Sequence, residues 1–124
     1  MSSQGDVRFA DGVAIIDLSG RITVGETAGL IRDRIRDLVE RGYKNILVNL
    51  DGVSYMDSAA GLGELVGCYV TLRNRGGELK LLNPRKTIRE LLRITKLETI
   101  FEIFSDEQEA LGSFRPARSS AGAA

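Results

Sequence analysis

Apolar and polar residues alternate along the chain in patterns that predict strands and helices following one another. Residues 7–20, VRFADGVAIIDLSG, form two extended stretches on either side of the turn signal Asp11-Gly12, which predicts an N-terminal hairpin. From Glu26, apolar residues recur at helical spacing until Gly42, a glycine placed to end a helix. The apolar positions of this predicted helix are Ile31, Ile35, Leu38 and Val39.

The middle of the chain continues the alternation. Residues 44–50, KNILVNL, make a nearly continuous apolar run, as expected for a strand covered on both faces. Ala59–Asn74 has a helical pattern and is followed by RGG. ELKLL, residues 78–82, predicts another buried strand. The predicted inner side of the second helix contains Leu62, Leu65, Val66, Tyr69, Leu72 and Arg73.

The last elements are predicted from capping signals. Asn83-Pro84 is expected to cap a helix and supply its first residue, and Ile88, Leu91 and Leu92 would form its inner face. TIFEIF, residues 99–104, predicts a last strand, and Ser105 to Gln108 a capping box before a short helix. The order of elements predicts an α/β domain with a largely parallel or mixed sheet.

Composition places the chain among ordinary globular proteins. Its 124 residues fit one domain, expected at residues 1–115, with residues 116–124 as a disordered tail. The 17 basic and 17 acidic side chains balance, so neither nucleic acid nor a membrane is required as a partner. No run is long and apolar enough to span a membrane, and the N-terminus does not resemble a signal peptide, so we expect a cytoplasmic protein.

Histidine is absent, which removes the commonest general base and the commonest transition-metal ligand. Triads of the Ser-His-Asp or Cys-His kind are therefore excluded. Carboxylate chemistry, phosphorylation of a hydroxyl group or simple binding stay open, and we predict no enzyme activity, cofactor or metal. The single cysteine, Cys68, cannot form an internal disulfide and is expected to be a small buried apolar residue.

The chain matches two known motifs only in part, a dinucleotide-binding glycine motif and a phosphoryl-receiver site. Gly61, Gly63 and Gly67 give GxGxxxG, which is one residue longer than the dinucleotide fingerprint. A phosphoryl receiver built on Asp51 or Asp57 would also need an acidic pair after the first strand, where the chain has only Asp17. Small residues that permit close packing are the simpler interpretation of the glycines.

Two helix faces are of interest for binding. The predicted outward face of the second helix is small and nearly uncharged, which favours close approach by another protein. It contains Ala60, Glu64, Gly67, Thr71 and Asn74. The following helix places four basic residues on one face, which is either solvated or a surface for an acidic partner. These residues are Lys86, Arg89, Arg93 and Lys96.

Ser58 stands between a buried strand and the helix with the bare face. A serine here is suited to capping free backbone N–H groups. A phosphate on it would be tolerated at the positive end of the helix but would repel a partner docked beside it. Phosphorylation could therefore change binding and leave the fold intact.

Residues 47–65, LVNLDGVSYMDSAAGLGEL, resemble the signature of STAS-domain anti-sigma factor antagonists, and the resemblance continues through residues 76–104. It implies a STAS fold, with a mixed sheet of four to five strands flanked by about four helices. It also implies a partner-switching protein that is not an enzyme. The unphosphorylated form would bind an anti-sigma factor serine kinase of the GHKL ATPase type and release a sigma factor. Phosphorylation would end binding, and a serine phosphatase would restore it.

The resemblance assigns roles to individual residues. Ser58 matches the phosphoacceptor and Asp57 the acid before it. The family usually has one residue between the serine and Gly-Leu-Gly, whereas this chain has Ala59 and Ala60. The alternative is a constitutive STAS scaffold without phosphorylation, and we expect a monomer or weak homodimer. The expected partner-binding residues are Asp57, Ser58, Ala59, Ala60, Gly61, Leu62, Gly63, Glu64, Gly67 and Thr71.

Overall fold

The computed structural model describes residues 4–23, 26–57 and 61–114. Within these ranges strands and helices alternate as predicted. In chain order the elements are β1 (Gln4–Ala10), β2 (Val13–Ile22), α1 (Glu26–Glu40), β3 (Asn45–Met56), α2 (Gly63–Asn74), β4 (Glu78–Leu82), α3 (Lys86–Ile94), the 3₁₀ turn η2 (Leu97–Thr99), β5 (Ile103–Phe104) and α4 (Glu107–Ser113).

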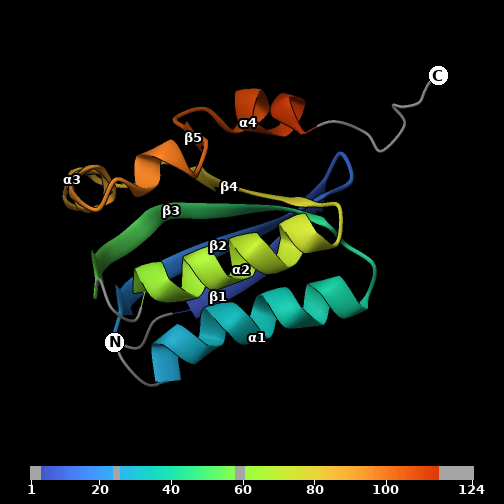
Figure 1. Cartoon of the computed structure of the whole chain (residues 1–124), viewed down its shortest axis with the longest axis horizontal. Helices are drawn as coiled ribbons and strands as arrows, with labels where there is room; N and C mark the ends of the chain where they lie inside the picture. Colours follow the sequence, from blue (N-terminus) through green and yellow to red (C-terminus); the bar gives the residue numbers. More distant parts are fainter. Residues whose placement is uncertain (1–3, 24–25, 58–60, 115–124) are drawn as a thin grey trace.

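The described strands form one sheet in the order β1-β2-β3-β4-β5. β1 is antiparallel to β2, and each later neighbouring pair is parallel, which confirms the predicted mixed sheet. Helices α1 and α2 cover one face of the sheet and α4 covers the other, while α3 lies at one end (Figure 1). The arrangement is an α/β layered fold, as expected when crossover helices join parallel strands.

The N-terminal hairpin turns at the predicted dipeptide. Asp11 and Gly12 have φ values of 53° and 79°. Two consecutive positive φ angles produce a turn whose twist matches that of the flanking strands, and Asp-Gly is well suited to it. Strand pairing then runs from Ala10 opposite Val13 to Gln4 opposite Ser19.

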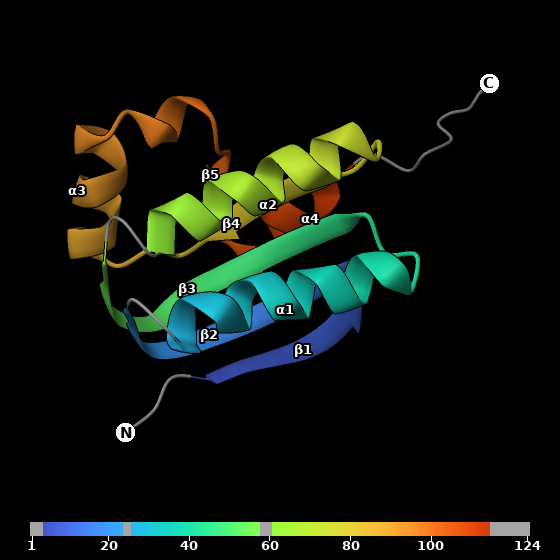
Figure 2. The same cartoon turned by 60° about the horizontal axis from the view of Figure 1, so that its bottom comes forward.

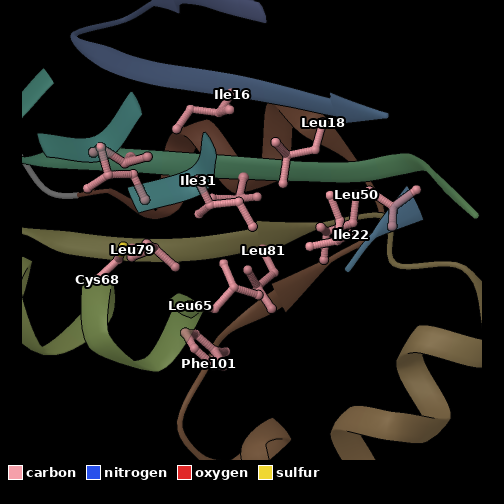
Figure 3. Packing of buried hydrophobic residues seen from close by; sticks show 14 of the residues in the cluster. Ile16, Leu18, Ile22, Ile31, Leu50, Leu65, Cys68, Leu79, Leu81 and Phe101 are labelled. Carbon is pink, nitrogen blue, oxygen red and sulfur yellow. The ribbon is translucent and has the colours of Figure 1, made fainter. Parts of the chain in front are cut away.

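The main core lies between the sheet and helices α1 and α2. In Figure 3, Leu65 and Cys68 of α2 are turned toward Leu79 and Leu81 of β4. Burial of each large aliphatic side chain in such a core contributes about 1.5–3 kcal/mol. The helix residues buried in this core are Ile31, Ile35 and Leu38 of α1, Leu65, Cys68 and Leu72 of α2, and Ile88 and Leu92 of α3.

A smaller core lies on the opposite face of the sheet, beneath α4. Leu47 of β3 points into it, whereas its neighbours Ile46 and Val48 belong to the main core. β3 is therefore covered on both faces, as its apolar run predicted. The other buried members of this smaller cluster are Val13, Ile15, Leu82, Ala110, Leu111 and Phe114.

Two polar clusters tie α4 to the sheet. The buried Lys80 of β4 donates from Nζ to the carbonyl oxygen of Ser113 at 3.0 Å and forms an ion pair with Glu102 at 2.6 Å. On β1, Arg8 bridges Asp17 and Glu107, with N···O distances of 2.6 Å to each. Both clusters therefore join α4 to strands that precede it in the sequence.

The prediction that Asn83 caps a helix begun by Pro84 is wrong. The helix begins at Lys86, and Arg85 occupies the capping position, but its side chain makes no capping hydrogen bond. Asn83 instead has a φ of 51° and donates its N–H to Phe104 O at 2.8 Å. Pairing with β5 holds Asn83 in a turn, and asparagine tolerates this left-handed conformation.

The predicted Ser105 capping box is wrong by one residue. Asp106 is the cap, and its Oδ2 accepts a hydrogen bond from the N–H of Glu109 at 3.0 Å. The predicted strand over residues 99–104 is also shorter than expected, because only Ile103–Phe104 pair with β4. Phe101 leaves the sheet and is buried in the main core.

Candidate functional site

The candidate site lies where β2 and β3 end. These strands are parallel and stay paired as far as Ile22 opposite Met56, so the segments that lead into α1 and α2 leave from the same edge (Figure 2). Asp57 continues the pairing by donating its N–H to Ile22 O at 2.8 Å. The carboxyl edge of a parallel sheet is the usual position of binding sites in α/β proteins.

Ser58, Ala59 and Ala60 lie outside the described residues, so the structure does not test the predicted phosphoacceptor. The residues on either side are described. Gly61 donates its N–H to Asp57 O at 2.7 Å. This hydrogen bond spans the segment and fixes where the chain enters and leaves it.

Gly61 and Leu62 attach the segment to the core. Both residues are buried, and Leu62 is only 3% exposed. A Cβ on Gly61 would overlap the side chain of Met56 and force it to move, and glycine permits this close approach. These two predicted partner-binding residues therefore support the site from beneath, and the exposed surface begins at Gly63.

The outward strip of α2 consists of Gly63, Gly67, Val70, Thr71 and Asn74. All five residues are exposed, and Val70 is 49% exposed although it is apolar. Among the described residues, no atom beyond the adjacent helix backbone lies within 4 Å of a Cβ placed on Gly63 or Gly67. A partner could therefore approach the helix backbone closely along this strip.

The strip differs from the predicted outward face by a rotation of the helix. Cys68 is buried at 7% exposure, and Glu64 is turned toward α1, where its carboxylate lies 3.1 Å from Arg32. The predicted inner side of the helix did not include Cys68, and the predicted outward face therefore did not include Val70. Including Cys68 in the buried stripe moves the opposite face toward Val70.

A groove of about 410 Å³ runs between α1 and α2, alongside the outward strip. Gly67 and Thr71 form part of its wall. The groove also contains Arg32, Ile35, Arg36, Val39, Glu40, Glu64, Cys68 and Arg75. Burial, assisted by the negative charge of Glu64, raises the pKa of the Cys68 thiol to about 11. The thiol is therefore protonated at neutral pH, which supports the predicted packing role.

Sequence analysis also missed an aromatic residue at this edge. Tyr55 is 42% exposed, and the Arg21 guanidinium carbon lies 4.5 Å from the centre of its ring. The register of β2 against β3 shifts between Gly20 and Arg21, which brings Arg21 opposite Tyr55. No pattern in the sequence around Ser54 and Tyr55 signals this register shift.

The described residues contain no group of three or more Cys, Asp or Glu side chains placed to hold a metal ion. None of the helices in the described ranges is long and apolar enough to cross a membrane. The edge presents a surface of small residues beside Asp57, and small side chains allow another molecule to approach the backbone closely.

Known proteins with similar sequences share this organisation. The anti-sigma-B factor antagonist of Bacillus subtilis is 35% identical over 98 residues, which cover 79% of this chain and 87% of the relative. The anti-sigma F factor antagonist of Paenibacillus polymyxa is 29% identical over 112 residues, which cover 90% and 94% of the two chains. The similarity therefore extends over nearly whole proteins.

Solved structures agree with the sequence comparison. The phosphorylated form of the Bacillus cell fate determinant SpoIIAA matches with a TM-score of 0.68 and 25% identity, covering 88% of this chain and 97% of that chain. The anti-sigma factor antagonist SpoIIAA has also been solved unphosphorylated and matches similarly. The family model described as the STAS domain matches residues 4–110, and the chain therefore belongs to the STAS domain family.

Proposed function

We propose that this protein is a cytoplasmic anti-sigma factor antagonist that docks through the outward strip of α2. The observation that carries the proposal is the exposed series of small residues that follows Asp57 at the carboxyl edge of the sheet. The relatives named as antagonists of anti-sigma factors support the same function. The protein acts as a ligand that is switched by its partner, without catalysis of its own.

Glycine on the exposed side of a helix requires an explanation. Gly67 lies in the interior of α2, where glycine costs about 0.5–1 kcal/mol of helix stability relative to alanine. No close packing inside the described part of the molecule requires it, because the space beyond its Cα is open. Contact between the α2 backbone and a partner accounts for keeping a residue that weakens the isolated helix.

The proposed switch is phosphorylation of Ser58 by the docked anti-sigma factor, a serine kinase of the GHKL ATPase type. A phosphate adds nearly two negative charges beside the outward strip of α2, and repulsion and desolvation together cost several kcal/mol at a protein interface. A serine phosphatase then restores binding. The existence of a phosphorylated form of the Bacillus relative SpoIIAA supports this mode of regulation.

Ser58 is favoured over the nearby Ser54 as the acceptor. Ser54 lies within β3, and its hydroxyl donates to Gly20 O at 3.3 Å. Ser58 is the only serine or threonine between Met56 and Tyr69. Two alanines, where the family usually has one residue, follow Ser58 and favour a second candidate function, a STAS scaffold that binds its partner constitutively.

The first test is peptide-level mass spectrometry after incubation with ATP and the cognate anti-sigma factor. We expect one phosphate on Ser58 in the wild type and in Ser54→Ala, and none in Ser58→Ala. A phosphate on another residue would contradict the assignment. Intact binding without any phosphate would support the constitutive scaffold.

The second test compares binding of Ser58→Asp with the matched control Ser54→Asp. Calorimetric titration with the anti-sigma factor should show at least a tenfold weaker Kd for Ser58→Asp, because one negative charge opposes docking. Ser54→Asp should bind like the wild type, since its side chain lies on the strand before Asp57. Equal binding by all three proteins would exclude the switch.

A further inference from the structure

α3 and its flanking residues form a strongly basic region in a chain of balanced charge. Residues 85–96 contain five basic side chains and one acidic side chain, although the whole chain has a formal net charge of zero. The buried positions Ile88 and Leu92 hold α3 against the main core. On the exposed side of α3 and just after it lie Lys86, Arg89, Arg93, Ile94 and Lys96, which we name the α3 ridge, and the exposed Glu90 lies among them.

The charges of the α3 ridge are little compensated inside the protein. Arg93 forms an ion pair with Glu90 at 2.6 Å. In the described ranges, Lys86, Arg89 and Lys96 form no ion pair. Since Lys86 and Arg89 are three residues apart on the helix, their like charges repel each other.

The start of α3 also departs from the usual chemistry of a helix N-terminus. Its first turn contains no acidic residue, and the side chain of Arg85 at the capping position does not cap the helix with a hydrogen bond. Arg85 and Lys86 place positive charges at the end of the helix dipole that favours negative ones. A sequence that violates several local preferences at one position commonly does so for function.

An apolar side chain lies within this basic surface. Ile94, at the end of α3, is 68% exposed, the highest value among the large apolar residues that the structure describes as exposed. The next residues turn away from the helix, because Lys96 has a φ of 64°. An exposed aliphatic residue with polar residues around it matches the arrangement of a protein interface, in which a polar rim surrounds an apolar centre.

The α3 ridge is near the proposed docking strip. Both views place α3 beside the N-terminal end of α2 (Figures 1 and 2). Arg85 additionally donates to Asp51 O at 2.7 Å, which fixes the start of α3 to the last part of β3. A partner docked on the outward strip of α2 would therefore have the α3 ridge alongside it.

We infer that the α3 ridge is a second contact for the same anti-sigma factor and binds an acidic surface of it, with Ile94 in an apolar depression. This inference rests on the proposed function. The ridge is less suited to a single-stranded nucleic acid, because it contains no aromatic side chain for stacking on bases. One exposed isoleucine on a nine-residue helix is also insufficient for membrane insertion.

The test measures association and dissociation rates of the full chain with the purified anti-sigma factor at 50 and 500 mM NaCl. Lys86→Glu/Arg89→Glu should reduce the association rate roughly tenfold at low salt and much less at high salt. Ile94→Ser should mainly raise the dissociation rate, by roughly fivefold. The matched control is Arg41→Glu/Lys44→Glu, which changes the net charge equally at the opposite end of β3 and should leave both rates near those of the wild type.

Gly67→Arg separates this inference from the proposed function. If Gly67→Arg loses binding and the α3 double variant behaves like its control, the antagonist function stands and the α3 contact is overturned. If the wild type does not bind the anti-sigma factor at all, both proposals fail. A third measurement tests binding of the wild type to phosphatidylglycerol-containing vesicles and to duplex DNA at 150 mM NaCl. The inference would also be overturned if the α3 double variant lost such binding while its rates with the anti-sigma factor were unchanged.

Discussion

The side chain of Met56 occupies the space that a side chain on Gly61 would need. Met56 is the last residue of β3, and Gly61 is the first described residue of the segment that leads into α2. The contact joins the end of the strand to the beginning of the docking helix, with Cγ2 of Ile22 3.4 Å from the same position. The distance between α2 and the sheet therefore depends on the absence of a side chain at residue 61.

Gly61→Ala should destabilise the protein by about 1–3 kcal/mol, because the added methyl group forces Met56 out of a filled position. Urea unfolding followed by circular dichroism measures this as a lower midpoint. Gly63→Ala is the matched control, since its added Cβ meets no described atom within 4 Å. Equal midpoints for the two variants would show that Met56 can move aside without cost.

Gly67→Ala should have opposite effects on stability and on binding. Alanine favours the interior of α2 by about 0.5–1 kcal/mol, so thermal unfolding should shift to higher temperature. The same methyl group projects into the docking strip and should weaken binding of the anti-sigma factor, which calorimetric titration measures. A more stable variant with unchanged affinity would show that the partner does not approach residue 67.

The bridge made by Arg8 should make stability depend on pH in the acidic range. Although burial by itself raises the pKa of Asp17, hydrogen bonds from Arg8 and Asn49 outweigh this and lower it. A hydrogen bond from Arg8 likewise lowers the pKa of Glu107. Ionisation of both carboxyl groups therefore favours the folded state above their ordinary pKa values, and this contribution is lost as pH falls through the lower folded-state values.

Arg8→Met should thus lower stability by about 1 kcal/mol at pH 7, a value limited by solvent screening of partly exposed groups. The difference from the wild type should shrink as the pH falls below about 4, where the carboxyl groups take up protons. Urea midpoints measured from pH 2.5 to pH 7 provide the test. A difference that is independent of pH would assign the role of Arg8 to packing of its aliphatic part.

Cys68 should react slowly with thiol reagents while the protein is folded. Its pKa of about 11 leaves little thiolate at pH 8, and the side chain is only 7% exposed. Release of thionitrobenzoate from Ellman's reagent should be at least a hundredfold slower in buffer than in 6 M guanidinium chloride. Reaction at comparable rates would mean that the groove between α1 and α2 opens readily.

The order of the elements was predictable because each has a clear periodicity. The run at residues 44–50 predicts a strand buried on two faces, and Leu47 indeed lies in a different core from Ile46 and Val48. Helix starts were less predictable where two capping residues are adjacent. Ser105 and Asp106 can both cap, and the structure uses Asp106, whose carboxylate reaches the N–H of Glu109.

The candidate site was predictable as a segment but not as a surface. The sequence identifies Asp57 and the glycines that follow, whereas the rotation of α2 depends on whether Cys68 packs inward. Pairing of Arg21 with Tyr55 depends on shifts in strand register, which no local pattern encodes. Tertiary packing therefore decides which small residues of α2 face a partner.

β3 is supported unequally along its length. β4 pairs with it only from Asn45 to Asn49, whereas β2 continues alongside it to Met56. Residues 50–56 consequently have a strand neighbour on one edge only. Separating them from the sheet therefore breaks fewer backbone hydrogen bonds than separating residues 45–49 does. The end of β3 that leads to Asp57 should therefore open at a lower free-energy cost than residues 45–49, so its shape can adjust to a bound molecule while the central sheet stays closed.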